Sequence, residues 1–301
     1  LTEAGVYSIR VQALDGEGNT GGYGEALVLN AINTRDGFTG IADNPAGNYI
    51  LIGDIDFGGI ILGGTDSPVG NLAVNATFTG VLDGNGYAVK NYSMAKSTSA
   101  LILRVDGTVR NLTVNINEYT THADSSPLVK DLYGTLENVS IVSLVTHGNK
   151  PTWGYAGFAA AYLRQGAAKL TDVTVSVVWT DGETETRATV FGRIDGTPTL
   201  ENCVAQLVNV PDTVVNAQTY ESGAEIKRIS YTQAAVEVDV GSTVQLSTDI
   251  TDGYTLSFES ANAEIATVDG TGLVTGVAGG ETAVIVTIKS GDVMGRAKAY
   301  E

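Results

Sequence analysis

A short pattern of apolar and polar positions recurs six times along the chain. Each copy has an apolar residue, any residue, Asn or Asp, and then two apolar residues separated by one position. The Asn or Asp of the successive copies lie 20 to 37 residues apart and are Asp54, Asn91, Asn111, Asn138, Asp172 and Asn202. Repeats of this length are typical of a solenoid in which each repeat forms one coil.

The residues after each Asn or Asp alternate with the period of a β-strand. Leu112, Val114 and Ile116 would face inward, and Thr113 would face outward. The apolar Val109 lies an odd number of positions before Leu112, so the alternation must break between them. Asn and Asp suit such a bend because they tolerate left-handed backbone. Stacked coils would then place the six Asn and Asp side chains in one ladder of hydrogen bonds.

Coils longer than the shortest repeat must carry their surplus as loops. We expect these loops at Gly58 to Ala76, Asn117 to Pro127, Thr146 to Gly157 and Thr180 to Ala188. The last three follow the ladder strand of their coils and should emerge on one side of the solenoid. Insertions collected on one face are often the binding face.

Composition narrows the class of protein. The formal net charge of -17 argues against nucleic acid or an anionic membrane surface as a partner. The 37 glycines and the low fraction of charged residues, 17%, favour an all-β protein with many tight turns. No apolar run is long enough for a membrane-spanning segment. The single cysteine, Cys203, occupies an inward position of its repeat and is predicted to be structural.

The first 28 residues have a pattern of their own. The stretch from Val6 to Leu14 alternates like a strand, and a Gly-rich turn follows it. This segment resembles the last strands of a fibronectin type III domain. The resemblance implies either the end of a preceding domain or an N-terminal extension of the solenoid. Because the sequence opens with Leu1 rather than Met, we expect a fragment of a larger multidomain chain.

The start of the solenoid carries more specific motifs. Thr34 can cap a short helix whose Phe38 and Ile41 would plug the open end of the first coil. The segments Tyr49 to Phe57 and Phe78 to Asn91 resemble the GLUG-type repeats of bacterial secreted and surface proteins. That resemblance implies that residues 29–210 form a right-handed parallel β-helix of about six coils with a capped N-terminus.

The C-terminal part has a different sequence pattern from the repeats. Residues 211–228 are predicted to be a connector or second cap. From 229 to 301 the chain closely resembles bacterial immunoglobulin-like domains of group 2, through Val240 to Leu246, Phe258 to Asp269 and Gly272 to Gly280. Phe258 stands where these domains usually have Trp. The resemblance implies a small β-sandwich in an extracellular or bacterial cell-surface setting.

Acidic residues are the first candidates for chemistry. Asp54, Asp56 and Asp83 could form a catalytic carboxylate pair or a calcium site. A structural role is favoured, because Asp54 is a ladder position and Asp83 opens a tight turn. We therefore predict no catalytic residue and no cofactor, with calcium as the alternative.

Aromatic residues near the loops are better candidates for binding. Trp153, Tyr155, Tyr119 and His147 are predicted to contribute to a binding face, because exposed rings stack on sugars or anchor protein contacts. Trp179 continues the inward series of its strand and is predicted to be core.

These observations favour a non-catalytic surface or secreted module that mediates adhesion or glycan contact. Its partner would be a glycan or a host or bacterial surface protein. One alternative is a carbohydrate-active enzyme of the polysaccharide lyase or hydrolase type, because parallel β-helices also host such enzymes. Another is a purely structural stalk.

Overall fold

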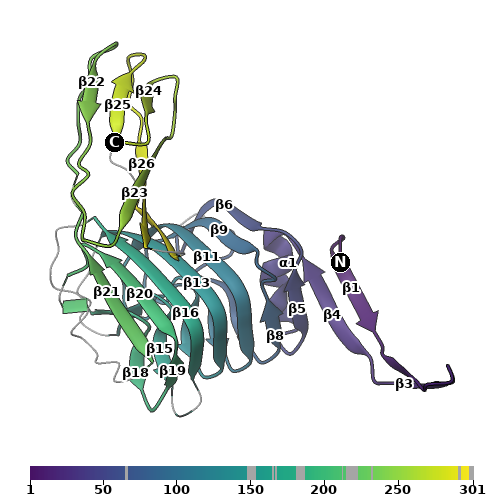
Figure 1. Cartoon of the computed structure of the whole chain (residues 1–301). Coiled ribbons are helices and arrows are strands. Elements are labelled where there is room, and N and C mark those ends of the chain that lie inside the picture. The colour runs from purple at the N-terminus through teal and green to yellow at the C-terminus, as the bar shows by residue number, and fades with distance from the viewer. Residues whose placement is uncertain are drawn as a thin grey trace.

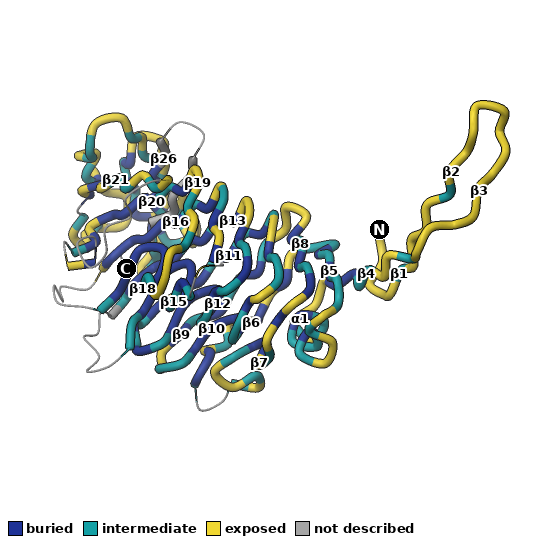
Figure 2. The backbone as a smooth tube through the Cα atoms, turned by 90° about the horizontal axis from the view of Figure 1, so that it is seen from below, coloured by how far each residue is buried: buried dark blue, intermediate teal, exposed yellow. Residues whose placement is uncertain are grey.

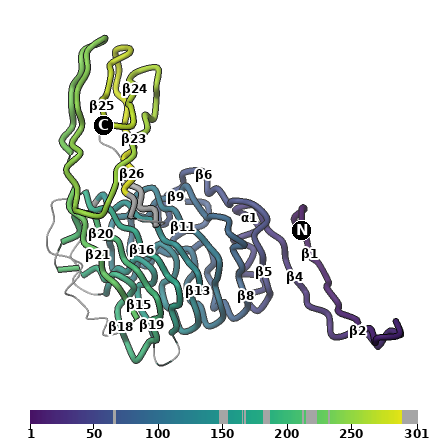
Figure 3. Tube along the Cα trace, in the orientation of Figure 1, coloured from purple at the N-terminus to yellow at the C-terminus, as the bar shows by residue number. Residues whose placement is uncertain are grey.

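The computed structural model describes residues 1–64, 67–147, 154–164, 166, 168–180, 187–211, 213–214, 223–231, 233–290 and 293–297. In this part the chain is all-β, with an extended N-terminal arm, a stack of coils and a C-terminal sandwich (Figure 1). The coils follow one another in chain order along the stack (Figure 3). Among the described residues, the helices are too short to cross a membrane.

One long sheet runs the length of the stack. Its main path has the order β1-β4-β5-β8-β11-β13-β16-β20-β21, and neighbours from β4 onward pair in parallel. The strands of this sheet in the stack are β4 (Leu27–Ile32), β5 (Asn48–Leu51), β6 (Ile55–Leu62), β8 (Val81–Asp83), β9 (Ala88–Met94), β11 (Thr108–Thr120), β13 (Thr135–His147), β16 (Lys169–Trp179), β19 (Thr199–Glu201), β20 (Cys203–Val208) and β21 (Ala224–Ile229).

A second parallel sheet forms another wall of the stack. Its order is β7-β10-β12-β15-β18, so the chain alternates between the two sheets and adds a strand to each sheet in turn. These strands are β7 (Leu72–Phe78), β10 (Ala100–Val105), β12 (Val129–Leu132), β15 (Ala160–Arg164) and β18 (Arg193–Asp195). Between the walls, β14 (Ala156–Gly157) pairs in parallel with β17 (Ala188–Thr189).

The core lies between the walls and follows the predicted alternation. Leu112, Val139 and Val173 are register partners on β11, β13 and β16, and all three are buried. Cys203 continues this inward position on β20, and its burial raises the pKa of its thiol. Trp179 is also buried, so the structural roles predicted for these two residues are confirmed.

The true repeat of the coils is set by apolar residues that precede the bend. These register partners are 33, 27, 27, 34 and 30 residues apart, by subtraction of their numbers, and are Tyr49, Leu82, Val109, Leu136, Leu170 and Leu200. The shortest coil is therefore longer than the 20 residues expected from the sequence. The difference arises because two copies of the short pattern, those with Asp54 and Asn91, lie one strand further along their coils than the other four.

Four of the six predicted ladder residues stack at the bend. Asn111, Asn138, Asp172 and Asn202 all have left-handed φ values between 50° and 54°. The Nδ2 of Asn138 donates to Oδ1 of Asn111 at 2.9 Å, and Asn111 in turn donates to Oδ1 of Asp83 at 3.0 Å. Asn202 donates to Asp172 at 3.2 Å. Each run of amides thus ends on a carboxylate, which can only accept.

The ladder prediction was wrong for Asp54 and Asn91. Asp54 is outside the left-handed region, and its carboxylate accepts from Lys90 Nζ at 2.6 Å and from the main chain of Ala88 at 3.0 Å. Asn91 is left-handed, but it belongs to a second, shorter ladder. Asn117 donates to Asn91 at 2.9 Å, and Asn91 donates to Asp56 at 2.7 Å. These residues lie one strand further along the coil, because Ile55 of the first copy pairs with Val89 of the second.

The ladder makes a testable contribution to stability. Asn111→Ala should lower the free energy of unfolding by about 2–3 kcal/mol, because it removes two side-chain hydrogen bonds and because Ala tolerates the left-handed φ of 52° less well than Asn. Asn111→Gly keeps the conformation and should cost about 1 kcal/mol less. Urea unfolding of the two variants separates the contributions. Equal stability of both variants and the parent would contradict the ladder.

The N-terminal end of the stack is capped as predicted. The helix α1 (Arg35–Thr39) begins after Thr34, whose side chain accepts from Gly37 N, and the 3-10 turn η1 (Gly40–Asp43) follows. Phe38 and Ile41 are fully buried, and the Phe38 ring meets that of Phe57 edge-on at 5.8 Å. The helix therefore covers the open end of the core.

The residues before the cap form a projecting arm. Its antiparallel strands are β1 (Gly5–Ile9), which pairs with β4, and β2 (Gln12–Leu14) and β3 (Thr20–Tyr23), which pair with each other. Figure 2 shows that this arm is almost wholly exposed. The alternation predicted for Val6 to Leu14 is thus divided between β1 and β2, which are separated by Arg10 and Val11.

The C-terminal sandwich has two antiparallel sheets. Their orders are β22-β25-β24 and β23-β26-β27. The strands are β22 (Thr243–Gln245), β23 (Thr255–Ser260), β24 (Ala266–Val268), β25 (Leu273–Gly276), β26 (Val284–Ser290) and β27 (Val293–Ala297). Phe258, predicted to replace the usual Trp, packs against the apolar clusters of the sandwich.

The solenoid and the sandwich share an apolar interface. Leu144, Val178, Val208 and Ile229 are register partners on β13, β16, β20 and β21, and they alternate with the inward residues of those strands. They are nevertheless buried, because they cluster with residues of the sandwich, namely Tyr231, Val286 and Ile288. The segment 211–228 was predicted to be a connector. Its last five residues instead belong to β21, which extends the long sheet of the solenoid.

Candidate functional site

One residue of the predicted binding face, Tyr119, belongs to the core instead. Tyr119 is fully buried, its hydroxyl donates to the carbonyl of Ser125 at 2.9 Å, and its ring meets Phe158 edge-on at 6.0 Å. An irregularity in the pairing of β11 with β13 after Ile116 brings Tyr119 back to the inward side. The ring of Tyr119 is therefore not available to a ligand at the surface.

The other three predicted residues have different outcomes. Trp153 lies outside the described residues. His147 is the last residue of β13, where its main chain is paired with that of Thr120. Tyr155 is half-buried and directly precedes β14, at the corner where the coil turns toward the second sheet. Tyr155 is therefore the residue from which a candidate site can be built.

Register places side chains of three successive coils beside Tyr155. Ser125, Ala156 and Ala188 pair across these coils, so the residues immediately before them form a column: Asp124, Tyr155 and Arg187. On the second sheet, β12, β15 and β18 align a similar column, Asp131, Tyr162 and Arg193. Each coil thus contributes the same type of residue, first Asp, then Tyr, then Arg, to both columns.

Hydrogen bonds fix the first two coils of these columns. The Tyr162 hydroxyl donates to Oδ1 of Asp124 at 2.6 Å, which links the columns diagonally. Asp131 accepts from Arg164 Nε at 2.7 Å and from Lys130 Nζ at 2.7 Å. Burial and the adjacent Asp124 carboxylate both raise the pKa of Tyr162. The Tyr162 phenol therefore stays protonated as a hydrogen-bond donor.

Aromatic and guanidinium groups gather around Tyr155. The rings of Tyr155 and Tyr162 meet edge-on with centroids 6.4 Å apart. The Arg164 guanidinium carbon lies 4.0 Å from the Tyr162 ring centroid, and that of Arg193 lies 4.6 Å from the Tyr155 centroid. Arg187 approaches the Tyr155 ring to 5.8 Å. We call these five residues, Tyr155, Tyr162, Arg164, Arg187 and Arg193, the Tyr155 patch.

The acidic residues considered from the sequence have structural partners. Hydrogen bonds from Lys90 and from the main chain of Ala88 lower the pKa of Asp54, and those from the Gly58 main chain and Asn91 lower the pKa of Asp56. Partial burial of Asp83 acts to raise its pKa, but bonds led by that from Asn111 lower it overall.

All three carboxyls are therefore ionised at neutral pH, whereas the general acid of a glycosidase needs a raised pKa. Among the described residues, no group of three or more His, Cys, Asp and Glu side chains could hold a metal ion.

A shallow groove also runs beside the ladder on the outer face of the long sheet. Thr113, Ser140 and Thr174 line it together with the ladder residues Asn111 and Asn138. It offers hydrogen-bonding groups but no aromatic side chain. The Tyr155 patch combines rings with charges and is the stronger candidate.

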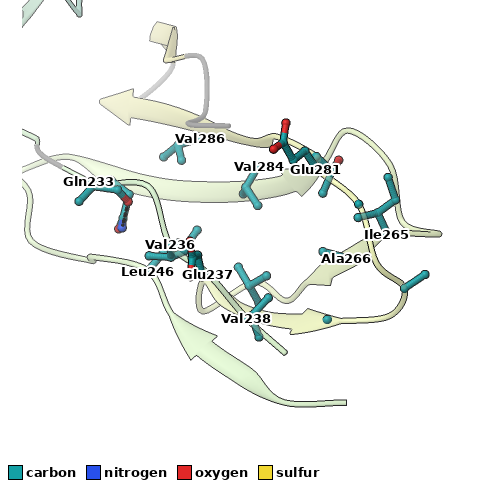
Figure 4. A pocket seen from close by; sticks show the side chains of 16 residues that line it. Gln233, Val236, Glu237, Val238, Leu246, Ile265, Ala266, Glu281, Val284 and Val286 are labelled. Carbon is teal, nitrogen blue, oxygen red and sulfur yellow. Dashed lines mark hydrogen bonds between the residues drawn. The ribbon is translucent and has the colours of Figure 1, made fainter. Parts of the chain in front are cut away.

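The sandwich contains a cavity of about 240 Å³ between its two sheets (Figure 4). Its walls are mainly aliphatic, including Leu246, Val274 and Val284, and its carboxylates, Glu237 and Glu281, belong to exposed residues. Residues 233–239 border the cavity without strand pairing. We interpret it as incompletely filled core of the sandwich.

The two columns correspond to a regular spacing of residues in the sequence. Asp124 and Asp131 are seven residues apart, as are Tyr155 and Tyr162, while Arg187 and Arg193 are six apart. This spacing reflects the short path from the corner of each coil to its strand in the second sheet. Alignment on the Asn ladder alone does not show it, because loops of different length separate the ladder from the corner.

Comparison with known proteins identifies the C-terminal sandwich. Residues 225–296 match the bacterial Ig-like domain (group 2) family, which confirms the resemblance found in the sequence. A segment of 104 residues, 33% of the chain, is 34% identical to Halomucin of Haloquadratum walsbyi, and the match covers 1% of that protein. No solved structure matches the chain.

Proposed function

We propose that this chain is a non-catalytic, surface-associated module that binds carbohydrate at the Tyr155 patch. In this proposal the coils form a right-handed parallel β-helix related to the GLUG-type repeats, and the Ig-like domain is a spacer. The Ig-like match and the similarity to Halomucin support a surface-associated setting. The protein would act outside the cell, in adhesion or glycan contact.

The observation that carries the proposal is the pair of half-buried rings in the Tyr155 patch. Tyr155 and Tyr162 are held edge-on at 6.4 Å, and the Tyr162 hydroxyl is fixed by Asp124. Rings whose orientation is set before binding lose little conformational freedom when a ligand stacks on them. Arg164 lies over Tyr162 and is held by Asp131 and Asp195, which makes the support of the patch rigid.

Tyr155→Ala should weaken binding to whichever glycan the chain recognises by at least about tenfold, as expected for truncation of a central aromatic contact. The measurement is a glycan array followed by calorimetry on the best ligand, with and without calcium. Tyr87→Ala is the matched control, because Tyr87 is an exposed tyrosine outside the patch. Unchanged affinity of the Tyr155→Ala variant, or an equal loss in the control, would refute the site.

The same assay separates the other functions. Release of shortened products would favour a polysaccharide lyase or hydrolase. Lack of binding to every glycan would favour a stalk or a protein partner. Tyr155→Phe guards against a folding artefact, because it keeps the ring and should bind much like the parent.

A further inference from the structure

Two cations of the Tyr155 patch differ from the other patch cation, Arg164, in their partners. Arg164 is bound by both Asp131 and Asp195, at 2.6 and 2.7 Å. Arg187 and Arg193 have no carboxylate partner among the residues that the structure describes. Both approach the ring of Tyr155 instead, at 5.8 and 4.6 Å. The second of the two coils that form the patch therefore carries two positive charges that no described acid neutralises.

Several other cations of the solenoid are paired with a carboxylate. Arg104 is paired with Asp106, Arg110 with Asp83 and Lys90 with Asp54, all at 2.9 Å or less. The chain has twice as many acidic residues, 34, as basic ones, 17. Although carboxylates are abundant, none in the described part of the chain pairs with Arg187 or Arg193, so these two cations are available to an external anion.

Guanidinium geometry favours a particular kind of anion. A guanidinium that lies over a ring uses its face for that contact, so N–H groups along its edge remain able to donate. Such an edge matches the paired oxygens of a carboxylate or a sulfate. Tyr155 lies next to both guanidiniums and offers the apolar surface on which a sugar ring can stack.

The overall negative charge of the protein opposes the binding of anionic ligands outside the patch. A net charge of -17 repels polyanions at long range. An anionic ligand would therefore gain little from non-specific attraction and would depend on contacts with Arg187 and Arg193.

We infer that the Tyr155 patch recognises an anionic glycan, with its carboxylate or sulfate held by Arg187 and Arg193 and its sugar ring on Tyr155. This inference rests on the proposed carbohydrate-binding function and names the class of ligand. Carboxylated and sulfated glycans share the chemistry that the two arginines would recognise.

Binding can be measured with two pairs of probes by calorimetry in moderate salt. Polygalacturonate is compared with its methyl ester, and dextran sulfate with dextran. We expect at least one anionic probe to bind at least about tenfold more tightly than its neutral counterpart. The preferred pair tells carboxylate from sulfate.

Charge variants then locate the contact. Arg193→Gln and Arg187→Gln should each weaken binding of the anionic probe by about tenfold and leave binding of the neutral probe unchanged. Arg10→Gln makes the same change in net charge on the exposed arm and should have no effect. Arg193→Lys keeps the charge but loses the planar fork, so its affinity should fall between those of the parent and Arg193→Gln.

The outcomes distinguish the two proposals. Equal binding of charged and neutral probes that is lost in Tyr155→Ala would overturn the anionic ligand and keep carbohydrate binding. Equal weakening by Arg10→Gln and Arg193→Gln would also overturn it, because bulk charge would then explain the effect. Failure of both anionic probes to bind, while a neutral glycan of the array binds and needs Tyr155, would overturn the anionic ligand alone; lack of binding to every glycan of the array would overturn both proposals.

Discussion

Replacing Leu112 by Asp should unfold the solenoid under conditions in which the parent chain is folded. Leu112 is 1% exposed and packs between coils, with Val139 as its register partner on the next strand. A carboxylate at this position would be buried without a cation. We expect a loss of at least about 4 kcal/mol in the free energy of unfolding. Thermal unfolding followed by circular dichroism should show a midpoint lower by about 8 °C or more.

The adjacent residue provides the control. Thr113 is half-buried, lies on the opposite face of β11 and borders the open groove beside the ladder. Thr113→Asp introduces the same side chain one position away and should change stability by less than about 1 kcal/mol. Similar losses in both variants would show that the assignment of inward and outward faces is incorrect.

The inward residues were predictable because burial imposes a period of two on a strand. Leu112, Val139 and Val173 follow their bends at a constant distance, and the structure buries them all. The cap was predictable for a similarly local reason, since Thr34 and Phe38 belong to one helix whose start signal lies within four residues. Local patterns of this kind are set by backbone geometry and depend little on the rest of the chain.

The register between coils was harder to predict. Asp54 and Asn91 share the short pattern of the true ladder residues, yet they lie one strand further along their coils. The short pattern describes a bend after an apolar residue and carries no information on which corner of the coil contains that bend. Pairing between strands decides that question, and it depends on loop lengths that differ from coil to coil.

The candidate site was also hard to predict, because it too depends on the register between coils. Tyr119 and Tyr155 both lie near predicted loops, but one irregularity in β11 turns Tyr119 into the core. Arg187 and Arg193 become neighbours of Tyr155 only when two successive coils are stacked in register. Residues far apart in the sequence therefore form the patch, and a single sequence gives no direct evidence of their contact.

The turns between the two walls of the stack impose a separate constraint. Gly47, Gly80, Gly107 and Gly134 stack at one corner, and each main chain lies directly against the next. A Cβ built on Gly107 would lie 2.1 Å from the carbonyl oxygen of Gly80, far inside van der Waals contact. That carbonyl accepts from Thr108 N at 3.0 Å, so it cannot move without breaking the pairing of coils.

Gly107→Ala should therefore lower the free energy of unfolding by about 3 kcal/mol, even though it adds only one methyl group. The contact is between two backbones, so no side-chain rotation relieves it. Gly40→Ala is the matched control, because Gly40 has φ -64° and a Cβ there would meet nothing within 4 Å. Urea unfolding should give that control a stability equal to or slightly above that of the parent. If Gly107→Ala were as stable as Gly40→Ala, the corner could widen by shifting whole coils, and the stack would be softer than its close backbone contacts indicate.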